Sequence, residues 1–232
     1  GNVTNMYYMF FGASAFNQPL EQWNVGNVNT MGGMFYNAST FNQPIGQWNV
    51  GNVTDMRSMF NAAFAFNQPI GQWNVGNVTN MGLMFWNKRV FNQDITNWDV
   101  GNVNDMYGMF VSFSNSTFNQ DIFSSWDTSK VKTMRYMFYQ NTNLNQTSIN
   151  NKIISKHNRT YKTWDTSNVT NMQYYFLRTS MTQAGVDGTA WWNISKSSEI
   201  SYLTNGLAVS SDNLHWDVSS VPSSSLTSQY GL

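Results

Sequence analysis

The sequence predicts an α/β repeat solenoid, in which each coil of about 25 residues holds one short strand and one short helix or 3-10 turn. Three observations predict it: a fixed period along the chain, a change of apolar spacing inside each period, and a neutral, aromatic-rich composition. The clearest repeat is FNQPIGQWNVGNVTDMRSMF at 41–60, which returns as FNQPIGQWNVGNVTNMGLMF at 66–85. A unit of this size cannot bury its apolar face alone, so neighbouring copies are expected to stack.

The period is shared by three residue types. Residues 25 positions apart are Trp23, Trp48, Trp73 and Trp98; Phe16, Phe41, Phe66 and Phe91; and Met6, Met31, Met56, Met81 and Met106. The spacing then loosens, since Met134 falls 28 positions after Met106. We therefore predict about seven coils over residues 1–176, with insertions near 111–125 and 147–163. Residues 177–232 are Ser-rich and depart from the pattern, which indicates a divergent C-terminal coil, cap or tail.

Within one unit the apolar spacing changes from strand-like to helix-like. Trp48 and Val50 alternate with polar neighbours, which is typical of a short strand. Met56 and Met59 follow at the spacing of a helical turn. Asp55 precedes the first Met, where unsatisfied backbone N–H groups need an acceptor. We expect a strand, then a turn, then a short helix in each coil.

Stacked coils place equivalent residues in columns, about 4.8 Å apart if the coils pair as strands do. One expected column contains Trp23, Trp48, Trp73, Trp98, Trp126 and Trp164. A second contains the Asn-Gln pairs at 17/18, 42/43, 67/68, 92/93, 119/120 and 145/146. Amide side chains in such a column bond to their own and adjacent coils, so we expect a structural ladder. The alternative is a polar comb that faces a glycan or ice, and for the Gln residues the two interpretations are about equally supported.

The composition excludes several classes of partner. Charged residues make up 10% of the chain and the net charge is zero, so no electrostatic footprint for nucleic acid or an anionic membrane is present. No cysteine occurs, which excludes disulfides and thiolate metal sites. No apolar run is long enough for a spanning helix. The sequence starts at Gly1 inside a repeat unit, from which we expect a processed or partial chain.

Three motifs carry a family resemblance: F-N-Q-x-I, W-[ND]-V-x-x-V and V-[TN]-x-M-x-x-M-F. Repeated at this period over residues 1–176, they resemble the repeat of mycoplasma-type surface lipoproteins and of BspA-like leucine-rich repeat surface proteins. The resemblance implies a leucine-rich-repeat-like solenoid, an extracellular or cell-surface location and a part in adhesion. It brings no catalytic residues. This chain departs from the leucine-rich pattern by using Phe, Trp and Met.

An acidic column forms in the later units. The place after each Trp is Asn in the first units and becomes Asp99, Asp127 and Asp165, while Pro44 and Pro69 give way to Asp94 and Asp121. Carboxylates stacked about 4.8 Å apart repel by roughly 0.9 kcal/mol per pair in water. A bound Ca²⁺ held by Asp94, Asp99, Asp121 and Asp127 would offset this. Solvent exposure with backbone N–H donors is the alternative, and no other cofactor is expected.

Catalysis has little support in the sequence. His157 lies in the second insertion and His215 stands beside Trp216, and neither has a spaced partner that suggests a triad or a zinc site. No phosphate-binding glycine loop occurs. A single acid-base pair would not need the repeated Asp column. We expect no enzymatic activity.

Sequons of the form Asn-x-Ser/Thr are frequent. If the chain is secreted from a eukaryotic cell, glycan is expected first at Asn115, Asn145 and Asn158, in or near the insertions, with Asn37 and Asn193 as further candidates.

Two non-enzymatic functions fit these features. In the first, the uncapped first coil, with Met6, Met9 and Phe10 in register, binds the far end of another copy and forms a head-to-tail filament. In the second, the chain is a monomeric adhesin that binds a surface glycan or protein. Trp191 and Trp192, outside the repeat, are the candidate binding residues for that function, unless they close the end of the core.

Overall fold

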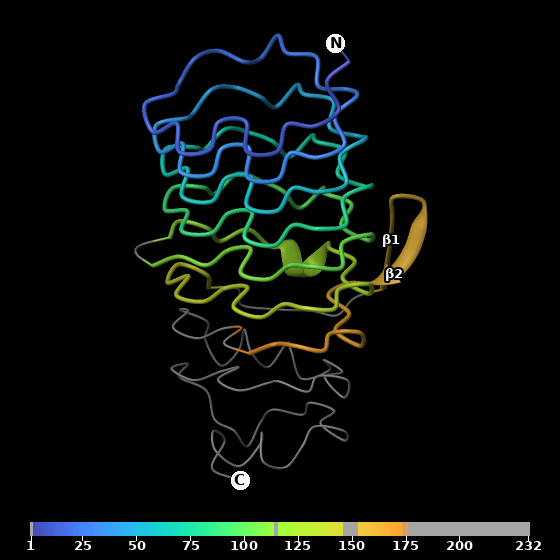
Figure 1. Cartoon of the computed structure of the whole chain (residues 1–232). Coiled ribbons are helices and arrows are strands. Elements are labelled where there is room, and N and C mark those ends of the chain that lie inside the picture. Colours follow the sequence, from blue (N-terminus) through green and yellow to red (C-terminus); the bar gives the residue numbers. More distant parts are fainter. Residues whose placement is uncertain (1, 114–115, 146–152, 174, 176–232) are drawn as a thin grey trace.

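The computed structural model describes residues 2–113, 116–145, 153–173 and 175. Over this part the chain winds through successive coils that lie on one another along one axis, with the N-terminus at one end (Figure 1). One residue per coil forms a parallel bridge to its equivalent in the next coil. The bridged residues are Asn5, Thr30, Asp55, Asn80, Asp105, Thr133 and Asn171.

Backbone N–H groups beyond each bridge alternate between two kinds of acceptor. The N–H of Tyr8 donates to Gly32 O in the next coil at 3.0 Å, and the N–H of Met9 donates to Met6 O in its own coil at 3.2 Å. A residue in the left-handed region recurs where Tyr8 stands. Its φ is between 56° and 61° at Tyr8, Gly33, Ser58, Leu83, Gly108 and Tyr136. The chain therefore turns repeatedly within each coil while every second N–H joins two coils.

This alternation corrects the expected content of each coil. The described residues form neither a strand nor a helix in the Met-containing segments, because a left-handed residue every few positions interrupts both. The regular elements of the described part are η1 (Ile122–Ser124), β1 (Ile153–Lys156) and β2 (Arg159–Lys162). They lie in the two expected insertions. β1 and β2 pair antiparallel, with Ile153 opposite Lys162, and project as a hairpin from one side of the coils (Figure 1).

The core consists of stacked columns of like side chains. Neighbouring rings of Phe10, Phe35, Phe60, Phe85, Phe110 and Phe138 have centroids 5.5 to 5.9 Å apart. The first five are each flanked by a second Phe of their own coil, as at Phe35 and Phe41, whose centroids are 3.9 Å apart at 8°. The Trp column adds directional bonds, since Trp48 Nε1 donates to Leu20 O in the preceding coil at 3.0 Å. Identical residues in adjacent coils thus fit one another.

The Asn-Gln pairs form the expected structural ladder. The N–H of Asn42 donates to Asn17 Oδ1 at 2.9 Å, and Gln43 Nε2 donates to Asn17 O at 2.9 Å. The same two bonds recur one coil further along at Asn67 and Gln68. This confirms the structural interpretation of the Asn column and extends it to the Gln column.

Candidate functional site

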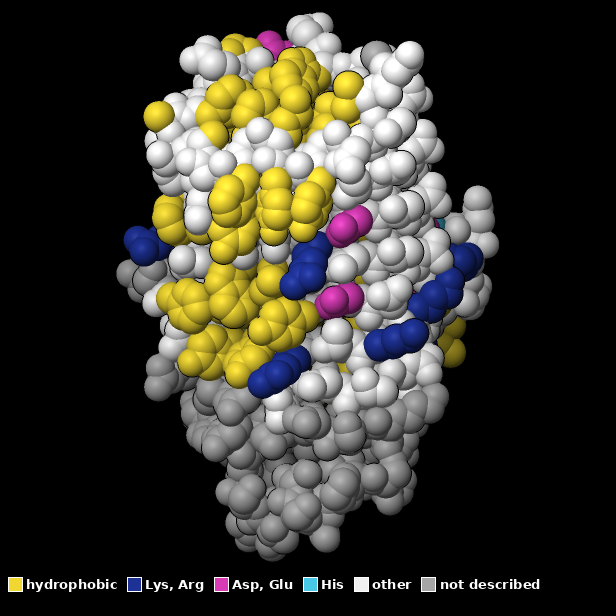
Figure 2. All heavy atoms as spheres, in the orientation of Figure 1, with side chains coloured by type: hydrophobic (Ala, Val, Ile, Leu, Met, Phe, Trp, Pro, Cys, Tyr) yellow, Lys and Arg dark blue, Asp and Glu magenta, His cyan; other side chains and the backbone are white. Residues whose placement is uncertain are grey.

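Aromatic side chains gather on one surface of the stacked coils, which we call the aromatic face. Figure 2 shows hydrophobic side chains collected over one side of the molecule. Ring contacts divide the face into two groups. The upper patch contains Tyr7, Tyr8, Phe11 and Tyr36. The lower patch contains Trp86, Tyr107, Phe113, Tyr136 and Tyr139.

The local turns explain why these side chains point outward. From Met31 to Phe138 the Met and Phe residues of each Met-x-x-Met-Phe-x segment are buried in the core, and the larger side chains between the two Met residues lie at least partly at the surface. In the first coil Met6 is 4% exposed, whereas Tyr7 and Tyr8 are 52% and 43% exposed. The outward positions vary from coil to coil, because no core contact fixes them.

Glycine in one coil receives an aromatic ring from the preceding coil. A Cβ at Gly33 would collide with the ring of Tyr8, and a Cβ at Gly108 would lie 2.7 Å from Cε3 of Trp86. These rings therefore lie against backbone positions where a Cβ would collide with them, which glycine avoids.

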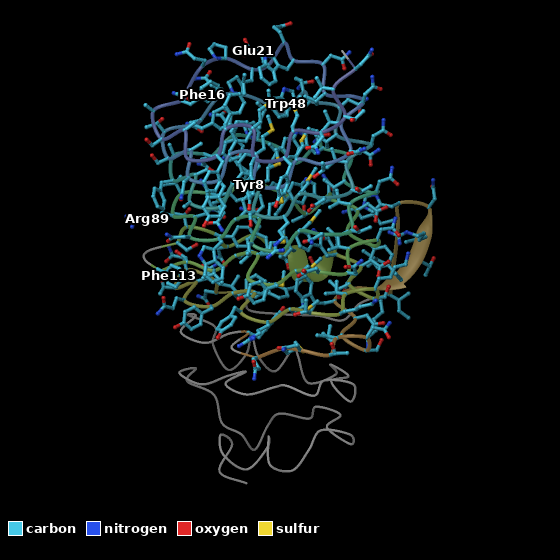
Figure 3. The ribbon with its side chains drawn as sticks, viewed as in Figure 1. Tyr8, Phe16, Glu21, Trp48, Arg89 and Phe113 are labelled. Atoms are coloured by element: carbon cyan, nitrogen blue, oxygen red, sulfur yellow. The ribbon has the colours of Figure 1, made fainter. Side chains whose placement is uncertain are left out.

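The lower patch has a floor and two walls. The planes of Trp86 and Tyr107 differ by 20°, with centroids 6.3 Å apart, and we call these two nearly parallel rings the floor. Phe113 stands at 70° to Trp86, and Tyr136 stands at 87° to Tyr107. Figure 3 labels Phe113 at the edge of the coils, on the same side as Arg89. The arrangement suits a ligand with a flat apolar surface.

Charged groups of both signs border the lower patch. Asp105 Oδ1 accepts the N–H of Tyr107 at 2.8 Å. The guanidinium of Arg135 lies over the Tyr136 ring, 4.8 Å from its centroid, a cation–π contact. Figure 2 shows acidic and basic side chains alternating along the border of the hydrophobic surface. The two signs offset each other, so the patch carries little net charge.

Buried polar atoms without a hydrogen-bond partner also lie in these coils. In the described part of the chain they are Asn87 Oδ1, Arg135 Nε and both amide atoms of Asn141. Such atoms are uncommon in native proteins and call for an explanation, because each one costs about 1 to 3 kcal/mol. Asn87 directly follows Trp86, and Arg135 directly precedes Tyr136.

A polar groove adjoins the lower patch along the chain. It has a volume of about 550 Å³ and is lined by Asn92, Thr117, Asn119, Thr142, Asn143 and Asn145. All of its lining side chains are amides or hydroxyls. Thr142 follows Tyr139 by three residues, so their Cα atoms are at most about 11 Å apart.

The acidic column meets a cation from the protein itself. Arg159, at the start of β2, pairs with Asp99 through Nη2 and with Asp127 Oδ2 through Nη1 at 3.0 Å. Asp94 Oδ1 instead accepts from the hydroxyl and the N–H of Thr96, at 2.7 and 2.9 Å, and these bonds lower the pKa of Asp94. Asp121 accepts the N–H of Ser124 at 3.2 Å.

These contacts give the carboxylates of the predicted calcium site partners within the protein. Among the described residues no group of three or more His, Cys, Asp or Glu is placed to hold a metal ion. The expected repulsion within the column is offset by the guanidinium of Arg159 and by hydrogen bonds to the carboxylates. Asp94, Asp99, Asp121 and Asp127 each accept hydrogen bonds from the protein, and calcium binding by them stays a prediction.

The hairpin is fixed to the coils by two further bonds. Lys156 Nζ donates to Thr96 O at 2.7 Å, and the hydroxyl of Tyr161 donates to Ser125 O at 2.7 Å. Burial lowers the pKa of Lys156 and raises that of Tyr161. The hairpin thus joins two adjacent coils from outside.

The repeat recurs over residues 1–176, and a comparison with protein-family models identifies its family. The model described as "Mycoplasma protein of unknown function, DUF285" matches residues 1–87, 65–157 and 150–228. The chain belongs to the DUF285 family. No curated protein and no solved structure matches it. Membership agrees with the mycoplasma-type part of the resemblance, and the BspA-like part stays a prediction.

The other predicted site residues of this DUF285 chain are placed as follows. Trp191, Trp192, Asn115, Asn193 and His215 lie outside the described residues. The sequon residues Asn37, Asn145 and Asn158 are exposed, and Asn158 lies in the turn between β1 and β2 with φ of 57°. Of the expected assembly residues, Met6 is buried, Phe10 is partly buried, and Met9 is 50% exposed. No helix in the described ranges could cross a membrane.

The sequence reasoning missed the aromatic face and the partner of the acidic column. A signal for the face was available: the positions after the first Met are Tyr, Gly, Arg, Gly, Tyr and Arg in successive units of the DUF285 repeat, while the Met positions do not change. The partners of Arg159 could not be predicted, because the sequence of an irregular insertion does not show which coil the insertion packs against.

Proposed function

We propose that this chain is a non-enzymatic extracellular or cell-surface protein, in which a leucine-rich-repeat-like solenoid presents the aromatic face to a partner and so mediates adhesion. The observation that carries the proposal is the lower patch, where Trp86 and Tyr107 form a floor of nearly parallel rings. Surface aromatics gathered in one place mark interaction sites in soluble proteins. Tyr, Trp and Arg, the residue types found here, are also those that dominate binding energies.

Three further observations support the scaffold and the absence of catalysis. Each coil bridges the next in parallel, so the face is held by a repeating frame. Asp99 and Asp127 are occupied by Arg159, and Asp94 is occupied by Thr96, which removes them as acid-base candidates. His157 is exposed in the hairpin turn.

Binding to intact cultured cells tests the proposal. Fluorescently labelled chain is compared with Trp86→Ala and Tyr107→Ala, and with the control Gln72→Ala, an exposed position that is not part of the aromatic face. We expect the two aromatic variants to lose most of the cell-associated signal and the control to retain it. Equal binding by all four proteins, with unchanged circular dichroism, would refute a role for the aromatic face.

Head-to-tail self-association is a second candidate. The observation that favours it is the exposure of Val3, Met9 and Phe11 on the first coil, at 47%, 50% and 54%. An apolar end that meets a different surface on the next copy would propagate as a filament. Electron microscopy of the purified chain should then show fibres, and a monodisperse monomer in size-exclusion chromatography would exclude them.

A further inference from the structure

The lower patch and the polar groove lie close together and differ in chemistry, one apolar and flat, the other polar and uncharged. We infer that together they bind a neutral carbohydrate chain. The inference rests on the proposed function and names its ligand class. Three features support it: the geometry of the floor, the chemistry of the groove and the balance of charge.

The floor suits a sugar ring. A pyranose presents faces made of C–H groups, which are apolar and nearly flat, and such faces stack on aromatic rings. The ring of Trp86 lies against Gly108 and is partly exposed, so part of its surface is available for stacking. Tyr107 extends the same surface, and Phe113 stands across its edge at 70° to Trp86.

The groove suits the rim of a sugar. Sugar hydroxyls both donate and accept hydrogen bonds, as do the amide and hydroxyl side chains that line the groove. Asn92 uses the two polar atoms of its side-chain amide differently. Its Oδ1 accepts the N–H of Asn119 at 2.9 Å and a bond from Gln120, so its Nδ2 donor is not needed for the ladder.

The charges favour a neutral ligand over an anionic one. Asp105 and Arg135 border the patch with opposite signs, and the groove has no charged lining residue. A polyanion, such as a sulfated glycan or a nucleic acid, would need a row of cations. A protein partner would find apolar contacts on the floor but none in the groove, whereas a glycan can use both.

A screen of immobilised neutral glycans, followed by calorimetry with each hit, tests the inference. For a true ligand we expect Trp86→Ala to weaken binding by about tenfold or more, as the loss of a stacking ring of this size implies. Trp86→Phe, which keeps a ring on Gly108, should lose much less. Thr142→Val should weaken binding a few-fold through the groove. The control is Gln72→Ala, an exposed position outside the aromatic face, which should leave the affinity unchanged.

Cell binding separates failure of the inference from failure of the proposed function. Cells are treated with periodate, which oxidises vicinal diols of sugars, or with protease. Loss of Trp86-dependent binding after periodate, together with a glycan hit, supports the inference. If binding needs Trp86 but survives periodate and is lost after protease, the carbohydrate assignment is overturned and the adhesive function stands. Glycan affinity that is unaffected by Trp86→Ala overturns the assigned site. Absence of both glycan and cell binding overturns the two proposals together.

Discussion

Lys88 should destabilise the fold, and its replacement by Met should stabilise it. Lys88 is 4% exposed and stands where earlier units have Ala38 and Ala63. Its ammonium donates to Ala63 O and lies 5.7 Å from the centroid of Phe66, with no carboxylate among its described partners. Burial lowers the pKa of Lys88 from 10.5 to about 7.

The magnitude follows from this pKa. Lowering the pKa of Lys88 from 10.5 to about 7 corresponds to roughly 5 kcal/mol of lost stability at neutral pH and below, since a tenfold change in an ionisation constant is about 1.4 kcal/mol. The Ala63 carbonyl favours the charged amine and offsets part of this, so we expect Lys88→Met to raise the free energy of unfolding by roughly 2 to 4 kcal/mol at pH 7. Met has a similar length and fills irregular apolar space well.

The lowered pKa of Lys88 also determines the direction in which stability changes with pH. Between pH 7 and 10.5 the unfolded chain binds the Lys88 proton and the folded chain releases it, so wild-type stability rises with pH in this window. From pH 7 to 9 the gain should be about 2 kcal/mol. Lys88→Met should lack it, whereas Lys132→Met, which removes an exposed lysine, should behave as wild type.

Urea denaturation at pH 6, 7, 8 and 9, followed by tryptophan fluorescence, measures these differences. At each pH the urea concentration at the transition midpoint is compared between the variants. The comparison requires that the unfolding free energy depends on urea concentration with the same slope in every variant. A Lys88→Met variant that is less stable than wild type at pH 7, or that shows the same rise up to pH 9, would refute the reasoning.

Four further predictions concern the frame. Arg159→Ala should lower stability by about 1 kcal/mol and Asp99→Asn with Asp127→Asn should restore it, because Asn serves this column in the earlier coils; failure of the rescue in thermal melts would argue against the ion pairs. Calcium and chelator should leave the melting temperature unchanged, and a rise of several degrees with calcium would reinstate the metal site. Trp73→Phe should cost about 1 to 3 kcal/mol, since Ile45 O loses its buried donor; a near-neutral effect by urea titration would contradict this. Gly33→Ala should destabilise more than Gly12→Ala, because both have positive φ but only Gly33 lies under a ring; equal losses would remove the packing role of Tyr8.

The repeat period predicted the column order, because residues that recur at a fixed spacing share one environment. Trp48, Val53 and Met56 are buried as their spacing indicates. Asp55 was expected to serve a backbone N–H after the bridge, and its Oδ1 accepts the N–H of Arg57 at 2.9 Å. A hydrogen bond of this kind can be predicted from the sequence because the donor and the acceptor are only two residues apart.

The conformation of the Met segment was not predictable in the same way. Its three- and four-residue spacing is typical of a helix, but the backbone bonds are shared with the next coil, and left-handed residues such as Ser58 and Leu83 accommodate that sharing. The periodicity of the sequence does not show which hydrogen bonds a segment makes to a neighbouring coil. Lys88 did carry a signal, since a lysine interrupts a column of alanines, but its burial depends on packing that only the structure shows.

The central claim is that equivalent residues of consecutive coils lie beside one another. The chain has no cysteine, so introduced pairs report on this directly. Gln47 and Gln72 are exposed, precede Trp48 and Trp73, and occupy equivalent places one coil apart; Asn97 occupies that place one coil further. At about 4.8 Å per coil, Gln47→Cys with Gln72→Cys falls within disulfide reach, whereas Gln47→Cys with Asn97→Cys does not. Under mild oxidation we expect an intramolecular disulfide, measured by intact mass, in the first pair and free thiols in the second. Free thiols in the first pair, or equal oxidation of both, would contradict the stacked-coil account.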